Sequence, residues 1–272
     1  MTKLAIFDID GTLVNSTEVD AECFVRSITE EFGIHDIDDH WEHYKNVTDA
    51  GVFEEILEKA FARKPSESEV QRHIKAFLRL LEASHAEDPG LFREVPGARN
   101  IVARLRNHPE WKIAIATGAW CESALFKLRA AGISAEGIPL VTGSEEKVRE
   151  RLVLRCIGEA ERHYVTYDSR RSKVKGRKSG VDAGKSVRMN SHPQGFDTAR
   201  GTFEKIVSIG DGIWDYEAAK RVGIGFVMID VKGRFGGSED FKTLRDYRDQ
   251  ELFMKRLEEA ANPPFPPLQR GI

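Results

Sequence analysis

Five short apolar runs, separated by stretches with helical spacing, constrain the fold of this chain more than any other feature. Their length and β-branched residues are typical of buried strands. The runs are Leu4–Ile9, Lys112–Thr117, Ile138–Thr142, Lys205–Ile209 and Gly225–Asp230. Strands that alternate with helices predict an α/β protein with a doubly wound, mostly parallel sheet. Such sheets bind ligands beyond the carboxyl ends of their strands, so we expect the functional residues there.

A long helical stretch separates the first two predicted strands. Apolar residues recur at helical spacing over Glu18–Phe32, Asp49–Phe61 and Ser66–His85. One helix is enough to connect neighbouring parallel strands, so the additional helices predict an inserted lobe. We therefore expect an α-helical cap domain over 15–94, after which Ala98–Arg106 resumes as the ordinary crossover helix. The Rossmann-like α/β core is then formed by 1–14 and 95–261.

Two segments lack the pattern of a packed element. The segment 166–200 is polar, and its nine Lys or Arg residues against three Asp give it a charge of +6, which leaves −9 for the remainder. We interpret it as a flexible basic insertion in the core. The tail 262–272 contains four prolines in quick succession, which prevent a helix, and it is expected to be extended and disordered.

Bulk composition excludes several classes of protein. Of the 272 residues, 40% are hydrophobic and 31% charged, and no apolar run approaches the ~18–20 residues of a membrane span. The three scattered cysteines, Cys23, Cys121 and Cys156, do not suggest a disulfide framework, so a cytoplasmic location is expected. The net charge of −3 argues against a dedicated nucleic-acid binder. Monomer and homodimer both remain open.

The first predicted strand ends in Asp8-Ile9-Asp10-Gly11. Alternation along a strand puts Asp8 and Asp10 on the same side, and Gly11 permits the turn that follows. Two carboxylates this close repel each other unless a cation lies between them or one of them is protonated. Both conditions suit phosphoryl transfer, which needs a metal, a nucleophile and a proton donor. An acidic turn or helix N-cap is the alternative for a lone Asp-x-Asp pair.

Two further strand ends carry polar residues. The second ends in Thr117-Gly118, whose hydroxyl and backbone N–H groups can hold a phosphate oxygen, although Thr-Gly is also ordinary turn chemistry. The fourth ends in Asp211, with Asp215 one helical turn later. Asp211 is suited to complete the coordination of a hard cation, and Asp215 to reach the same metal or orient its waters. Asp215 equally fits a structural role at the positive end of the following helix.

In this order, the motifs resemble those of the haloacid dehalogenase superfamily, whose strands end in Asp-x-Asp-Gly-Thr, in Thr or Ser, and in Gly-Asp-x-x-x-Asp. The helical stretch resembles the cap of its phosphoglycolate phosphatase and β-phosphoglucomutase branch. The resemblance implies that Asp8 is the nucleophile and Asp10 the general acid/base. It also implies Mg²⁺ held by Asp8, the backbone carbonyl of Asp10 and Asp211, with Asp215 nearby. Oxygen ligands without His or Cys favour magnesium over zinc.

The superfamily also has a lysine before the helix that follows the third strand. Here Thr142–Glu150 offers Lys147 first and Arg149 second, and the usual Lys-Pro pair is absent. Lys147 has the better spacing to the apolar face of the helix, so we assign it to phosphate binding with Thr117 and Gly118. The alternative is a solvated cation with no role in the site.

Substrate choice is expected to lie in the lobe. The segment Lys45–Gly51 breaks two helical stretches, and related caps place their specificity loop at about this point. Asn46, Thr48 and Asp49 are therefore the candidates. A purely local role, in which Thr48 or Asp49 caps the helix Val52–Ala62, is also compatible with the sequence and does not exclude the first.

These observations predict a phosphoric monoester hydrolase that uses magnesium and an aspartyl-phosphate intermediate on a small phosphorylated metabolite. A sugar phosphomutase retains both acids of the first motif and is the alternative, whereas a dehalogenase has no need of Asp10. A third hypothesis is a nucleic-acid or polyanion binder that uses basic residues of the insertion. These residues are Arg170, Arg171, Lys173, Lys175, Arg177 and Lys178. Apart from Tyr167 they lack interleaved aromatics, which disfavours that hypothesis.

Overall fold

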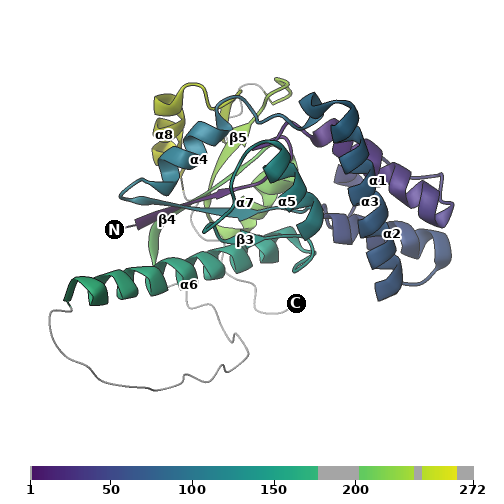
Figure 1. The fold of residues 1–272 in the computed structure, drawn as a ribbon, viewed down its shortest axis with the longest axis horizontal. Coiled ribbons are helices and arrows are strands. Elements are labelled where there is room, and N and C mark those ends of the chain that lie inside the picture. Colours follow the sequence, from purple (N-terminus) through teal and green to yellow (C-terminus); the bar gives the residue numbers. More distant parts are fainter. Residues whose placement is uncertain (1, 177–201, 236–240, 262–272) are drawn as a thin grey trace, which may run out of the picture.

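A six-stranded parallel sheet forms the centre of the protein in the computed structural model (Figure 1). The structure describes residues 2–176, 202–235 and 241–261, and only the backbone of 166–176. The strands are β1 (Thr2–Phe7), β2 (Trp111–Ala116), β3 (Leu140–Val141), β4 (Phe203–Gly210), β5 (Gly225–Ile229) and β6 (Lys242–Leu244). The predicted α/β fold is confirmed, although β3 is shorter than expected and the edge strand β6 was not predicted.

The strand order is β3-β2-β1-β4-β5-β6. The chain first adds β2 and β3 on one side of β1, and then β4, β5 and β6 on its other side. Phe7 of β1 pairs with Ile115 of β2 and with Ile209 of β4, which aligns the ends of these three strands. A crevice forms where the strand order reverses in this way. The residues that follow β1, β2 and β4 therefore come together.

The helices follow the predicted periodicity closely. They are α1 (Thr17–Phe32), α2 (Asp49–Phe61), α3 (Glu67–Glu87), α4 (Ala98–Arg106), α5 (Cys121–Ala130), α6 (Arg149–Gly176), α7 (Ile213–Val222) and α8 (Gln250–Glu259), with 3-10 turns at Trp41–His43 and Pro89–Phe92. A capping box starts α3, because Ser66 and Glu69 each accept the other's backbone N–H.

Both faces of the sheet are buried, because successive side chains of a strand point to opposite faces. Ala5 and Phe7 of β1 belong to one apolar cluster, which also contains residues of α4, α5 and α8. Leu4 and Ile6 belong to the other, which contains residues of α6 and α7. The result is a three-layer arrangement that holds the strand ends rigidly.

Helices α1, α2 and α3 lie together beside the sheet (Figure 1). His73 is fully buried among them, and its ring stacks on Phe53 at 4.3 Å and meets Phe24 edge-on at 4.8 Å. Two antiparallel linkers connect this lobe to the sheet, with Val14 bridged to Glu94. The predicted helices of the lobe are confirmed; their function as a cap is part of the proposal below.

The expected loop at 166–200 is wrong at its start, because α6 continues through residue 176. The helix packs on the sheet through an apolar face that includes Leu152, Cys156 and Tyr164, whose hydroxyl donates to the carbonyl of Ile113 at 2.7 Å. No Gly or Pro interrupts the following polar residues before Gly176, so nothing ends the helix earlier. Residues 177–200 and the tail 262–272 lie outside the described residues.

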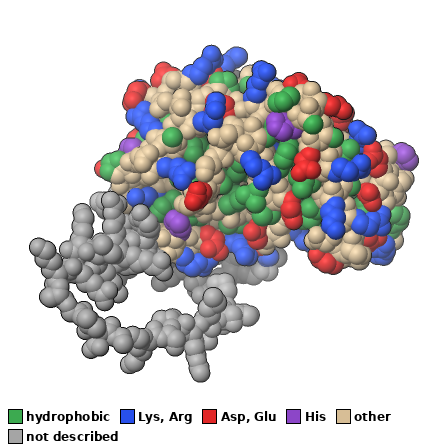
Figure 2. Space-filling model, in the orientation of Figure 1, with side chains coloured by type: hydrophobic (Ala, Val, Ile, Leu, Met, Phe, Trp, Pro, Cys, Tyr) green, Lys and Arg blue, Asp and Glu red, His purple; other side chains and the backbone are tan. Residues whose placement is uncertain are grey.

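Charged side chains of both signs are interspersed on the face shown in Figure 2. No helix in the described part of the chain has both the length and the apolar character that crossing a bilayer requires. The side chains of the predicted basic cluster at 170–178 lie outside the described residues.

Candidate active site

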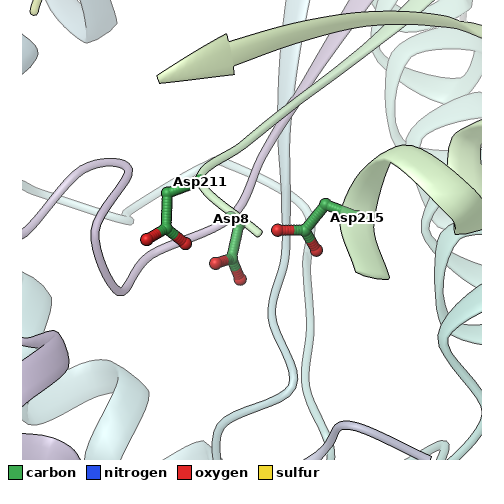
Figure 3. Close-up of side chains that lie close together, drawn as sticks. All are labelled: Asp8, Asp211 and Asp215. Carbon is green, nitrogen blue, oxygen red and sulfur yellow. The ribbon is translucent and has the colours of Figure 1, made fainter. Parts of the chain in front are cut away.

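Three carboxylates converge at the carboxyl ends of β1 and β4 (Figure 3). Asp8 directly follows β1, Asp211 directly follows β4, and Asp215 lies in the first turn of α7. One oxygen from each side chain lies within 4.8 Å of the others. The register that aligns the two strands explains this convergence, since the Asp8 N–H donates to the Ile209 carbonyl at 2.9 Å.

This cluster carries more negative charge than its protein surroundings balance. Burial is the main cause that raises the pKa of Asp8 and Asp215, and it raises the pKa of Asp211 to about 7. Repulsion from Asp215 adds to the shift at Asp8 and at Asp211. Asp8 Oδ1 is buried and has no hydrogen-bond partner among the described residues. Buried carboxylate oxygens whose negative charge the protein does not balance are suitable ligands for a divalent cation such as Mg²⁺.

Arg149, and not Lys147, lies in this site. Its Nη1 donates to Asp215 at 2.8 Å and lies 3.6 Å from Asp8 Oδ1, and its Nε donates to the Val47 carbonyl at 2.9 Å. Lys147 is half exposed and pairs with Glu54 of α2. The assignment of Lys147 to phosphate binding therefore finds no support in the geometry, and its runner-up occupies the position.

Asp10 is held by a buried lysine that the sequence analysis did not identify. The ammonium of Lys127 in α5 donates to Asp10 Oδ1 and Oδ2 at 2.8 and 2.7 Å, and to Asp20 of α1 at 2.5 Å. Ser16 adds a hydrogen bond to Asp10 at 2.6 Å. Burial opposes the charge on Lys127, but the neighbouring carboxylates outweigh it and raise the pKa of the lysine. Burial and repulsion from Asp10 raise the pKa of Asp20.

A pocket that is partly open to solvent connects these groups. Asp8, Asp10, Asp211 and Arg149 line it together with Thr117 and Gly118, which follow β2. Gly118 is required there, since an added Cβ would lie 2.8 Å from Arg149 Nη2 and 3.1 Å from Thr48 Cα. The structure thus brings the predicted strand-end residues into one cavity.

The predicted specificity segment also reaches this cavity, through Thr48 and Asp49 but not through Asn46. Thr48 is the N-cap of α2, where its hydroxyl accepts the Gly51 N–H at 3.1 Å, so its local capping role is confirmed, and its role in substrate choice stays a prediction. Asp49 accepts the Trp120 N–H at 2.8 Å. Burial raises the pKa of Asp49 to about 6, against the opposing effect of Lys127.

Lys127 could have been noticed from its position in the sequence. It lies three residues after Ala124 and four before Ala131, on a buried helix face that carries no other charged residue. A lysine on such a face needs a buried partner. Its partner Asp20 gives no such signal, because acidic residues are common in the first turn of a helix.

Comparison with known proteins agrees with this geometry. A family model described as haloacid dehalogenase-like hydrolase matches residues 2–223. Among proteins with curated functions, no relative matches the sequence.

Several solved structures share the fold. A hydrolase from Pseudomonas syringae superposes with a TM-score of 0.62 at 18% identity, covering 96% of this chain and 100% of its own. A candidate β-phosphoglucomutase from Bacteroides vulgatus superposes with a TM-score of 0.58 at 14% identity, covering 95% of this chain and 89% of its own. CbbY from Rhodobacter sphaeroides, in complex with xylulose-1,5-bisphosphate, superposes with a TM-score of 0.57 at 17% identity, covering 92% of this chain and 96% of its own. Because the family model spans most of the sequence, the chain belongs to the haloacid dehalogenase-like hydrolase family.

Proposed function

We propose that this hydrolase is a magnesium-dependent phosphatase that releases phosphate from a small phosphorylated metabolite through an aspartyl-phosphate formed on Asp8. The observation that carries the proposal is the buried Asp8 Oδ1, which accepts no hydrogen bond from the described residues and lies in the same pocket as Asp10 and Arg149. A carboxylate without hydrogen bonds keeps a free lone pair for attack, and a proton donor lies within the same cavity.

Asp8, Asp211 and Asp215 would hold the metal, with the backbone carbonyl of Asp10 as a further ligand by family resemblance. Magnesium, when bound, supplies positive charge that offsets the repulsion between an anionic nucleophile and a phosphate ester. The residues fit this ion because all the donors are oxygens, and because the protein alone does not balance their charge.

The reaction has two displacements in which Asp8 and Asp10 change roles. An oxygen of Asp8 attacks phosphorus, the bond between phosphorus and the leaving oxygen breaks, and Asp10 donates its proton to that oxygen. Asp10 then takes a proton from water, whose oxygen attacks phosphorus. The bond to Asp8 breaks, and phosphate leaves with the nucleophile regenerated.

Arg149 and the turn after β2 would bind the transferred phosphoryl group. The guanidinium is already fixed by Asp215 and Val47, so it loses little side-chain freedom when it meets a phosphoryl oxygen. Thr117 is almost fully buried at the pocket wall, where its hydroxyl can donate to the same group. Fixed donors of this kind stabilise charge that develops during transfer.

The test is release of phosphate from 4-nitrophenyl phosphate with magnesium, by the natural protein and by Asp8→Asn. The amide keeps the size of the side chain but cannot attack phosphorus, so we expect at least a 1000-fold loss of kcat, in the range of nucleophile removal. Asp39→Asn, the same change at an exposed aspartate, should leave activity unchanged. Phosphate release by a folded Asp8→Asn at a near-normal rate would refute the proposal.

A further inference from the structure

The pocket that contains Asp8, here called the chamber, has an acidic and aromatic wall on the side of the helical lobe. The charged lobe residues that line it are Asp20 and Asp49, and among the described lining residues the lobe contributes no Lys, Arg or His. The apolar part of this wall is Ala21, Phe24, Trp41, Val47 and Val52. Phe24 and Trp41 meet edge-on with their ring centroids 5.9 Å apart.

The two cations nearest to this wall already have partners. All three N–H groups of the Lys127 ammonium are engaged, two by Asp10 and one by Asp20. Arg149 is bound to Asp215 and Val47 and points its remaining nitrogen toward Gly118, where the phosphoryl group would lie. Neither cation is therefore available to an anionic group on the leaving side of a substrate.

Hydrogen bonds connect Thr48 and Asp49 of this wall to the α/β core. The Asp49 N–H donates to the Gly118 carbonyl at 2.8 Å, and the Asp49 carboxylate accepts the Trp120 N–H at 2.8 Å. The Thr48 hydroxyl donates to the Lys147 carbonyl at 2.9 Å. Asp49 thus faces the chamber with one carboxylate oxygen still free of a hydrogen bond from Trp120. Burial raises its pKa, and the positive charges of Lys127 and Arg149 oppose that shift.

We infer that the substrate is a phosphate monoester of an amino alcohol, whose ammonium group lies against Asp49 and the ring of Trp41. This inference rests on the phosphatase activity proposed above and adds the chemical class of the leaving group. A carboxylate attracts an ammonium group, and an aromatic face adds a cation–π interaction. A carboxylate or second phosphate in the same place would meet the carboxylate of Asp49 and no free cation.

Three small phosphate esters of similar size test the inference on the natural protein. They are 2-aminoethyl phosphate, 2-hydroxyethyl phosphate and phosphoglycolate, which differ mainly in the charge at the end of the leaving alcohol. We expect kcat/KM to fall in that order, with at least about a tenfold difference between the first and the last, equivalent to ~1.4 kcal/mol. A smaller ratio, or a preference for phosphoglycolate, would overturn the inference.

Variants then assign the selectivity to the wall. Asp49→Asn keeps the acceptor for Trp120 but removes the charge, so the ratio of ammonium to carboxylate ester should fall at least threefold. Glu58→Gln removes a charge from the exposed face of the same helix and should leave the ratio unchanged. An unchanged ratio in folded Asp49→Asn, or an equal fall in Glu58→Gln, would contradict the assignment.

A second variant covers the case in which Asp49→Asn fails to fold. Trp41 is only partly buried, so Trp41→Leu should be tolerated, and it should lower kcat/KM for the ammonium ester more than for the hydroxyl ester. Equal losses on both esters would count against the inference. Cleavage of 4-nitrophenyl phosphate separates the two proposals. If the protein cleaves this ester but does not prefer the ammonium ester among the three small esters, the phosphatase activity is supported and the inference of an amino alcohol is refuted.

Discussion

Lys127→Met tests how much the buried ammonium contributes to the folded state. Methionine is also unbranched and apolar along its length, so the change removes the charge and its three hydrogen bonds with little loss of packing. The Lys127 side chain is fully buried, whereas Asp10 and Asp20 remain 20% and 16% exposed. Removing one partner of a buried pair costs about 3–5 kcal/mol, and the residual exposure of the acids favours the lower end.

A loss of about 3 kcal/mol corresponds to a fall in Tm of roughly 6–12 °C for a chain of this size. The loss should depend on pH, because the variant raises the pKa of Asp20 in the folded state further above its unfolded value. Protonation of Asp20 then favours folding at low pH, and this contribution is lost as pH rises through the folded pKa. The difference from the natural protein should therefore be small near pH 4, the unfolded pKa of aspartate, and grow toward neutral pH.

Urea unfolding of both proteins at pH 4.5 and pH 7.5 measures this difference. Arg129→Met removes a charge from the exposed side of the same helix and should change the free energy of unfolding by less than about 0.5 kcal/mol. Adding Asp20→Asn to Lys127→Met should recover part of the loss, since it removes one unpaired charge. An equal loss at both pH values would refute the electrostatic explanation and indicate a packing defect.

Two other changes probe the metal and the turn beside the pocket. Asp211→Ala should raise the magnesium concentration for half-maximal activity by at least roughly tenfold, as expected for loss of a direct ligand; an unchanged requirement in a magnesium titration would mean that Asp215 or another acid holds the ion. Gly143→Ala should cost about 1–3 kcal/mol of stability in a thermal melt and impair activity, because its Cβ would lie 2.2 Å from the Gly118 carbonyl oxygen. Gly225→Ala, with its nearest contact at 3.2 Å, should cost less, and equal losses would contradict the steric argument.

Much of the fold and half of the site follow from local sequence patterns. The alternation of short strands and helices was sufficient to predict a parallel sheet, because burial on both faces leaves a distinct apolar signature. Asp8, Thr117 and Asp211 were predictable because each directly follows a strand, and the strands of a doubly wound sheet end at one edge. The extension of α6 to residue 176 was missed because a polar, basic stretch resembles a loop in sequence.

Tertiary structure alone decided which charged groups meet. Lys127 and Asp20 lie 107 positions apart, and their pairing depends on how the chain brings α1 and α5 to the same site. Lys147 lies just before α6 and Arg149 begins it, so no periodicity could show which would face Asp8 and which would turn to Glu54. Local patterns determine the elements and the groups at their ends. The partners of a buried charge are fixed only when the helices dock and exclude water around it.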